Sequence, residues 1–249
     1  MNSTTIINKL TELKYIGFKD AYLRQLEDVN YHSLGFEDRL YNLLDSQAIH
    51  LQDKRIIMNS RLSKIKDKQA FVQEIDYNAR REINKDQILS LISMNFIRSY
   101  QNIVITGKTG TGKSYLAQAL GNRAIVDGFT VYYIRAANLL EEIKIARLDG
   151  TYTNLIKKYT KYKLLIIDDF GVSPISSDDA TNLFEVIESR FEISSTLISS
   201  QLPVKQWYEY LNNNTVADAI LDRISNSSHR VELKGPSMRE IKSNIDINY

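Results

Sequence analysis

The most specific chemical signal in the sequence is a glycine-rich loop that ends in a lysine and a serine. Residues 107–114 read GKTGTGKS, which matches the pattern G-x-x-x-x-G-K-[ST]. Glycines let consecutive backbone N–H groups turn toward one anion, and a helix that begins near Lys113 would add the positive end of its dipole. Lys113 is expected to reach the β- and γ-phosphates of a nucleotide, and the Ser114 hydroxyl is expected to bind Mg²⁺. The residues predicted to hold the nucleotide are Gly107, Lys108, Thr109, Gly110, Thr111, Gly112, Lys113 and Ser114.

An acidic pair follows a hydrophobic run further along the chain. The run 163–169, KLLIIDD, ends in Asp168 and Asp169, which is typical of a Walker B element. Asp168 is expected to hold Mg²⁺ through water, and Asp169 is expected to act as the general base that polarises the attacking water. By itself the run also fits a strand that ends in a solvated acidic turn. The phosphate loop upstream favours the metal site.

The class of nucleotide chemistry follows from two further segments. A GTPase would need a guanine-reading N/T-K-x-D segment after the loop, but the nearest candidate, residues 84–87, lies before it and has glutamine in the fourth place. The polar run 196–201, TLISSQ, favours an ATPase with an additional strand between the loop strand and the acidic strand. Gln201, or next to it Ser200, is then the candidate sensor of the γ-phosphate or of the attacking water. The alternatives are a core strand capped by a turn and, for the whole protein, a small-molecule kinase.

The elements that must position these residues come from the patterning of the chain. Apolar residues recur at helical spacing in residues 1–70, which predicts a small all-helical N-terminal domain. Residues 69–99 are expected to form a linker strand and the helices that lead into a second domain, residues 71–249. There, β-branched runs alternate with helical patterns, and several lack polar alternation, which predicts a parallel α/β sheet flanked by helices. The predicted strands are 102–107, 130–135, 163–169, 195–200 and 229–233.

Composition excludes several other classes of protein. The 249 residues include no cysteine, which excludes disulfide frameworks and thiolate metal sites and fits a reducing compartment. The three histidines are scattered, so histidine-bound metal is not expected. The longest aliphatic run, residues 164–167, is far shorter than a membrane span, and the first residues do not resemble a signal peptide. We therefore expect a cytoplasmic protein without a membrane partner.

Taken together, several motifs resemble the IstB family of AAA+ ATPases, the helpers of insertion-sequence transposition that are related to the DnaC and DnaI helicase loaders. The resemblance covers about residues 70–249, and its narrowest part is the block SQLPVKQWYEYL, ADAILDRI and HRVELKG. It implies a P-loop AAA+ sheet. Because the chain ends soon after the final predicted strand, the full helical lid of larger AAA+ proteins is expected to be missing. Asp169 stands where glutamate is commoner, which fits slow hydrolysis and an ATP-held switch.

The resemblance also implies roles for arginines. Arg223 matches the arginine finger, which would reach the γ-phosphate bound by a neighbouring subunit and place the active sites of a homo-oligomer between its copies. Arg239 resembles a sensor arginine that contacts the nucleotide, and Arg230 ranks lower as a candidate. The alternative for Arg223 is an ion pair on a helix surface with Asp222 or Asp218.

Basic residues gather in two places that could contact DNA, although the net charge is only +2. The first cluster ends the helical region and comprises Lys54, Arg55, Arg61, Lys64, Lys66 and Lys68. The second surrounds residues 141–163, where the resemblance places DNA contacts in a helical insertion, with the candidates Lys144, Arg147, Lys157 and Lys158. Phosphate contacts of this kind are salt-sensitive and independent of base sequence. The alternative is a solvated lysine-rich face.

These features predict an Mg²⁺-dependent ATPase that assembles on double-stranded DNA. The resemblance implies that the protein recruits or stimulates a transposase during transposition. A replicative helicase loader of the DnaC/DnaI type is the nearest alternative, and a nucleotide-gated scaffold that hydrolyses nothing is another.

Overall fold

The computed structural model describes residues 2–77, 82–225 and 228–238. By its internal contacts the chain divides into two compact units, Met1–Met58 and Asn59–Tyr249. The division falls within helix α3 (Phe36–Leu62), so residues 59–70, which the patterning groups with the helical region, belong to the unit that contains the sheet. None of the helices in the described ranges is both long and apolar enough to cross a bilayer.

The first unit is helical throughout its described part. It comprises α1 (Ser3–Glu12), α2 (Ile16–Glu27), a 3-10 turn (Val29–Ser33) and most of α3, which is one continuous helix. Helices α2 and α3 approach closely at Gly17, where a Cβ atom would lie 2.5 Å from the backbone oxygen of Ser46. Only glycine fits this crossing. The side chain of Gln25 adds a polar link, because its Nε2 donates to the backbone oxygen of Arg39 at 2.9 Å.

The second unit is built on a five-stranded parallel sheet with the strand order β2-β3-β4-β1-β5. The strands are β1 (Asn102–Gly107), β2 (Val131–Arg135), β3 (Leu164–Phe170), β4 (Ser195–Ser200) and β5 (Ser228–Leu233). All five predicted strands are present within one residue at each end. Strand β4 lies between β1 and β3, so the additional strand of the predicted ATPase fold is confirmed.

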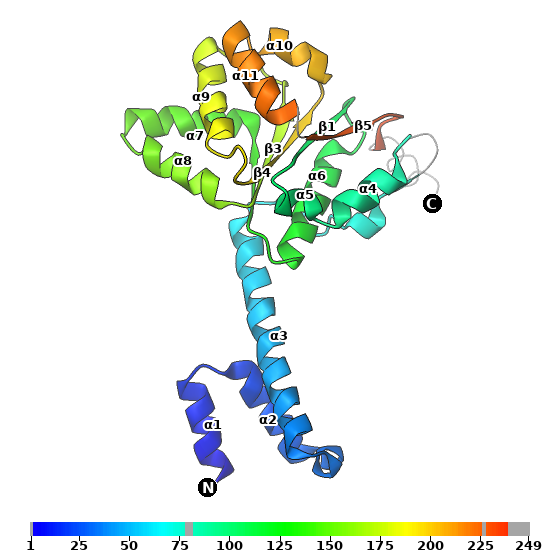
Figure 1. Cartoon of the computed structure of the whole chain (residues 1–249), viewed down its shortest axis with the longest axis vertical. Helices are drawn as coiled ribbons and strands as arrows, with labels where there is room; N and C mark the ends of the chain where they lie inside the picture. The colour runs from blue at the N-terminus through cyan, green and yellow to red at the C-terminus, as the bar shows by residue number, and fades with distance from the viewer. Residues whose placement is uncertain (1, 78–81, 226–227, 239–249) are drawn as a thin grey trace, which may run out of the picture. The chain divides into compact units, whose positions relative to one another are not determined.

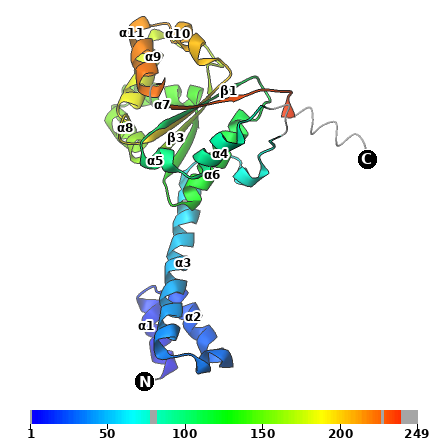
Figure 2. The same cartoon turned by 45° about the vertical axis from the view of Figure 1, so that its right-hand side comes forward.

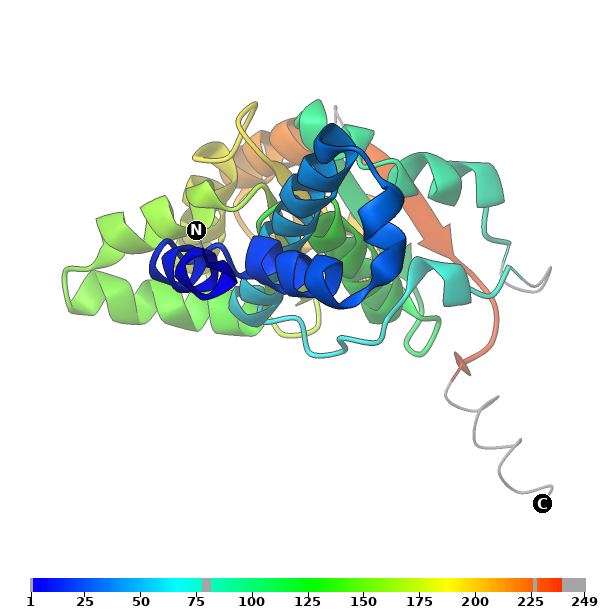
Figure 3. The same ribbon diagram turned by 90° about the horizontal axis from the view of Figure 1, so that it is seen from below.

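Helices cover both faces of this sheet (Figures 1 and 2). One face carries α6 (Lys113–Val126), beside which α4 (Lys85–Ile92) packs, followed by α5 (Asn95–Arg98). The other face packs against a continuous apolar cluster contributed by α7 (Ala136–Leu148), α8 (Tyr152–Lys161), α9 (Ser177–Glu188), α10 (Trp207–Tyr210) and α11 (Asn214–Ser225). Helices α7 and α8 lie side by side as a hairpin (Figures 1 and 3). The sheet is therefore buried on both faces, as its unbroken apolar runs predict.

The segment after α3 lies along the edge strand β2 and against helix α6. The backbone N–H of Tyr133 in β2 donates to the oxygen of Ser63 at 2.7 Å, and the Gln118 side chain in α6 accepts from the backbone N–H groups of Lys66 and Asp67. Within the described residues this segment contains a 3-10 turn (Val72–Glu74) and no strand, so the expectation of a linker strand is wrong. Its backbone groups bond to side chains of α6, which leaves no ladder for a strand to form.

Candidate nucleotide-binding site

The phosphate loop joins the carboxyl end of β1 to the amino end of α6. Gly110 and Gly112 adopt φ angles of +83° and +92°, which side chains rarely tolerate. A Cβ atom on Gly110 would also lie 2.3 Å from the Ser237 hydroxyl oxygen. Both the φ angle and this close approach therefore favour glycine at this position. The Lys113 ammonium donates to the backbone oxygen of Lys108 at 2.8 Å and thereby folds back over the loop. The loop has the shape expected of an anion cradle at a helix amino end.

The loop opens into a cavity of about 460 Å³. This volume lies in the range of small-ligand sites. Of the predicted nucleotide residues, the lining includes Thr109, Gly110, Gly112, Lys113 and Ser114, and the predicted catalytic residues Asp169 and Gln201 line it as well. The structure therefore brings the loop, the acidic turn and the sensor candidate to one place. Residues that sequence reasoning missed complete the wall: Glu74, Ile75, Asp76, Tyr115 and Met238.

Gln201 reaches the loop because of the order of the strands. It follows β4, which lies directly beside β1, so both carboxyl ends meet at the same edge of the sheet. The Thr109 hydroxyl donates to Gln201 Oε1 at 2.8 Å. A side chain held there contacts the loop directly and can respond to the phosphates that the loop would bind.

The acidic pair occupies two different environments. A register irregularity between Ile167 and Phe170 interrupts the pairing of β3 with β4 at the two aspartates. Asp169 has a φ of +56°, lines the cavity and pairs through Oδ2 with Arg135 Nε at 3.2 Å. Asp168 is only 1% exposed and is not among the residues that line the cavity. The bulge therefore turns one carboxylate into the cavity and keeps its neighbour within the protein.

Two residues that are not among the predicted site residues donate hydrogen bonds to Asp168. The Tyr133 hydroxyl donates to Asp168 Oδ2 at 2.5 Å, and the Ser199 hydroxyl donates to Oδ1. Burial, together with this hydrogen bond to a carboxylate, raises the pKa of Tyr133 well above its ordinary value, so the phenol stays protonated. The order of the strands is the one signal that could have found these residues, because β2 and β4 flank β3.

The residues present fit a nucleoside triphosphate with Mg²⁺. The loop supplies backbone N–H groups and a lysine, while Ser114 and Asp169 in the lining, with Asp168 next to it in the chain, offer oxygen atoms of the hard kind that this ion prefers. Over the described part of the chain, no group of three or more His, Cys, Asp or Glu side chains could hold a metal ion by itself. Mg²⁺ usually keeps several waters and binds through one or two carboxylates together with substrate phosphates. A site of this composition therefore depends on the nucleotide.

The predicted finger Arg223 lies away from this cavity. Its backbone oxygen accepts a hydrogen bond from Asn102 Nδ2 at 3.0 Å. Asn102 is the first residue of β1, whereas the phosphate loop begins at the last residue of that strand. Its guanidinium pairs with Glu188 and Asp222, each at 2.8 Å. The pairing with Asp222 is one that the sequence offered as the alternative. Arg239 lies outside the described residues, and Arg230 is an exposed residue of β5.

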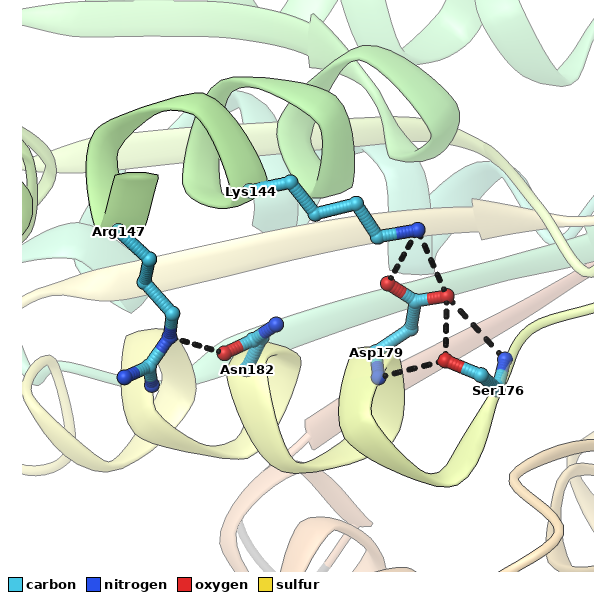
Figure 4. Close-up of polar contacts among 5 residues, drawn as sticks. All are labelled: Lys144, Arg147, Ser176, Asp179 and Asn182. Atoms are coloured by element: carbon cyan, nitrogen blue, oxygen red, sulfur yellow. Dashed lines mark hydrogen bonds and ion pairs between the residues drawn. The ribbon is translucent and has the colours of Figure 1, made fainter. Parts of the chain in front are cut away.

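Two of the predicted DNA contacts hold α7 against α9 (Figure 4). Lys144 Nζ lies 2.9 Å from Asp179 Oδ1, and Arg147 Nε donates to Asn182 Oδ1 at 2.7 Å. Burial opposes ionisation of Asp179, but hydrogen bonds from Lys144 and Ser176 outweigh it and lower the pKa of Asp179. These cations are therefore already engaged within the protein.

The other two predicted DNA contacts lie on α8. Lys158 donates to the Tyr132 hydroxyl at 3.0 Å and pairs with Glu142 at 3.2 Å. Lys157 is exposed and forms no ion pair with any residue in the described ranges. It borders an open hollow of about 440 Å³ lined by Thr130, Asn154, Lys157, Lys158, Lys161 and Tyr162. Of the four candidates, Lys157 is thus the one that forms no ion pair within the described residues.

Comparison with known families agrees with this geometry. The family described as IstB-like ATP binding protein matches residues 8–245. The chain belongs to this family. Its IstB-like relatives include the "Putative insertion sequence ATP-binding protein y4uH" of Sinorhizobium fredii, which is 36% identical over 241 residues and covers 97% of both chains. The "Insertion sequence IS232 putative ATP-binding protein" of Bacillus thuringiensis is 38% identical over 168 residues, 68% of this chain and 67% of the relative. The predicted family is confirmed.

Solved structures show the same fold as this IstB-like chain. The crystal structure of DnaI has a TM-score of 0.56 at 21% identity and covers 67% of this chain and 92% of its own. AMPPCP-bound DnaA from Aquifex aeolicus has a TM-score of 0.57 at 19% identity, and the match covers 74% of this chain and 57% of the DnaA chain. The predicted P-loop AAA+ fold is therefore confirmed for the sheet unit.

Proposed function

We propose that this IstB-like protein is an Mg²⁺-dependent ATPase that assembles on double-stranded DNA and recruits or stimulates a transposase. The observation that carries the proposal is the meeting of the phosphate loop, Asp169 and Gln201 around one cavity, with β4 between β1 and β3. ATP binding follows from the family. Hydrolysis, DNA binding, assembly and the transposase partner are the steps that we propose beyond it.

The proposed chemistry assigns one task to each side chain at the cavity. Lys113 neutralises the β- and γ-phosphates, and Ser114 with Asp168 holds Mg²⁺, which would offset charge on the phosphoryl group. Asp169 polarises the attacking water from within the cavity, and Gln201 senses the γ-phosphate. Because aspartate is shorter than glutamate by one methylene, we expect slow turnover, which suits a switch held by ATP.

We propose that the active site is completed by a second copy of the chain. Arg223 lies at the amino end of β1, and a strand of six residues separates that end from the loop by roughly 17 Å. Arg223 therefore cannot contact the phosphates of a nucleotide bound by the loop of its own chain. Its ion pairs with Glu188 and Asp222 are partly exposed, so exchanging them for a neighbour's phosphate costs little. We therefore propose a homo-oligomer in which each ATP is bound between two neighbouring copies of the chain.

The names of the relatives and the exposed lysines of α8 support the proposed partners. Those relatives are named insertion sequence ATP-binding proteins, which supports a transposase as the protein partner. Exposed lysines beside the α8 hollow support contacts with the DNA backbone that do not depend on base sequence. We place the protein in the cytoplasm, where such DNA lies. A helicase loader stays the alternative, because DnaI has the same AAA+ fold.

Sedimentation and electron microscopy with long double-stranded DNA test the proposal. Large ordered assemblies are expected only when DNA and a nonhydrolysable ATP analogue are both present, because the nucleotide bound by one copy supplies the phosphate that Arg223 of its neighbour contacts, and the resulting oligomer binds DNA. Monomers under all four combinations would contradict the proposal. Pull-downs with the transposase and with a replicative helicase then separate the two partners, since capture of the helicase alone would favour a loader.

A further inference from the structure

Asp168 is a buried carboxylate held by hydrogen-bond donors on both of its oxygens. Oδ1 accepts from the Ser199 hydroxyl and, at 2.9 Å, from the backbone N–H of Asp169. Oδ2 accepts from the Tyr133 hydroxyl at 2.5 Å. A carboxylate offers about four acceptor positions. With these three filled, the open position lies on Oδ2, beside the tyrosine hydroxyl.

The donors come from the strands on either side of β3. Tyr133 in β2 pairs with Ile166 in β3, and Asp168 lies two residues further along the same face of that strand. Ser199 projects from β4 on the other side. Hydrogen bonds between side chains of three paired strands hold the Asp168 carboxylate more rigidly than bonds from a loop would.

Tyr133 is itself firmly held. Only 5% of it is exposed, and its backbone N–H donates to Ser63 on the outer edge of β2 at 2.7 Å. Strand β2 would otherwise leave that donor unpaired, because no other strand covers this edge within the described residues. The phenol is thus fixed by its backbone as well as by packing.

We propose that Tyr133 is a positioning residue of the magnesium site, which holds Asp168 so that its one open acceptor position faces the metal-bound water. This inference rests on the proposed metal role of Asp168. Without the tyrosine hydroxyl, the carboxylate keeps its charge but loses the donor that fixes Oδ2. Removing a partner that orients a metal-binding group commonly costs 10–100-fold in metal affinity.

The neighbouring residue supplies a matched control. Tyr132 is also 5% exposed in β2, but its side chain lies on the opposite face, where its hydroxyl accepts from Lys158 at 3.0 Å. Tyr133→Phe and Tyr132→Phe each delete one buried hydroxyl from the same strand. Only the first removes a donor from the acidic pair.

The test measures how strongly Mg²⁺ strengthens ATP binding. The dissociation constant of a fluorescent ATP analogue is determined in EDTA and in saturating Mg²⁺, and the ratio reports the coupling to the metal. For Tyr133→Phe we expect this ratio to fall by about 10-fold, with the value in EDTA unchanged. Ser199→Ala should lower it in the same direction, and Tyr132→Phe should leave it as in the wild type. Thermal unfolding of each variant confirms that it is folded.

Three results would overturn the inference: an unchanged ratio in Tyr133→Phe, an equal fall in Tyr132→Phe, or equal losses of affinity with and without metal. Asp168→Asn separates these from failure of the proposed function. If Asp168→Asn abolishes the coupling and Tyr133→Phe does not alter it, the tyrosine has no positioning role. If Asp168→Asn also leaves the coupling intact, the proposed metal role of Asp168 is itself wrong.

Discussion

Two adjacent aspartates illustrate how strongly the environment of a residue decides its possible chemistry. Asp169 is 37% exposed as a side chain, lines the cavity and faces Arg135, whereas Asp168 is buried among hydroxyl donors. The bulge in β3 produces this difference. An exposed carboxylate at the cavity suits a general base, and a buried, oriented one suits an ion that must be held in place.

At the scale of single residues, we predict that Lys113 is needed for ATP binding. Its ammonium now bonds to the backbone oxygen of Lys108, a position from which it can turn to a phosphate. Lys113→Ala removes a charged hydrogen bond, which is worth about 1.5–3 kcal/mol, so ATP affinity should fall by about 10-fold or more. Calorimetric titration with ATP measures this loss, and turnover should fall with it. Lys205→Ala, a change to an exposed lysine away from the cavity, is the control; intact binding and turnover in Lys113→Ala would refute the loop assignment.

Secondary structure elements separate the basic residues into two kinds. On α7, Lys144 and Arg147 face α9 and hold the hairpin to the rest of the unit (Figure 4). On α8, Lys157 is exposed beside the hollow. Helices thus determine which cations hold the protein together and which remain open to a ligand.

We therefore expect different consequences from two lysine substitutions. Lys157→Gln should weaken DNA binding and reduce the slope of log K against log salt by about 0.9, the value for one phosphate contact. Lys144→Gln should affect DNA binding less and should lower the free energy of unfolding by about 1 kcal/mol, because the buried Asp179 loses its cation. Fluorescence anisotropy over a range of salt concentrations and chemical denaturation measure the two effects. The reverse ranking would mean that α7 releases Lys144 to bind DNA.

At the scale of the whole molecule, the phosphate loop and the proposed finger Arg223 lie at opposite ends of strand β1. The cavity gathers at the carboxyl ends of the strands, while Arg223 contacts the first residue of β1. Under the proposed function, one chain supplies the phosphate loop and the neighbouring copy supplies Arg223. We therefore expect hydrolysis to depend on assembly.

Mixing two inactive variants tests that dependence. Lys113→Ala keeps the finger and Arg223→Ala keeps the loop, so some interfaces of a mixed oligomer combine an intact loop with an intact finger. Turnover should rise when the two proteins are combined, because an arginine supplied by a neighbour can be worth about 10³-fold or more in rate. The control mixture replaces Arg223→Ala with the double variant and should stay inactive. Failure of every ratio to restore turnover would exclude a finger that acts between copies.

The fold was largely readable from local patterns. Buried runs such as Ile103–Ile105 and Leu164–Ile167 predicted strands because a strand covered on both faces excludes polar residues along its whole length. The linker strand was mispredicted, because the fate of residues 69–75 depends on side chains of α6 that lie more than forty residues away. The spacing of residues within a short segment cannot indicate partners that are so distant in the sequence.

The sequence alone determined the phosphate loop, the acidic pair, the sensor candidate and the family, because each depends on residue types at short, fixed spacings. The roles of the individual site residues stay predictions. Tertiary structure alone revealed the partners of Asp168, the ion pair between Arg135 and Asp169, and the engagement of Lys144 with α9. Those contacts join residues about thirty-five positions apart, and they exist because the strand order β2-β3-β4-β1 and the packing of α7 on α9 bring them together.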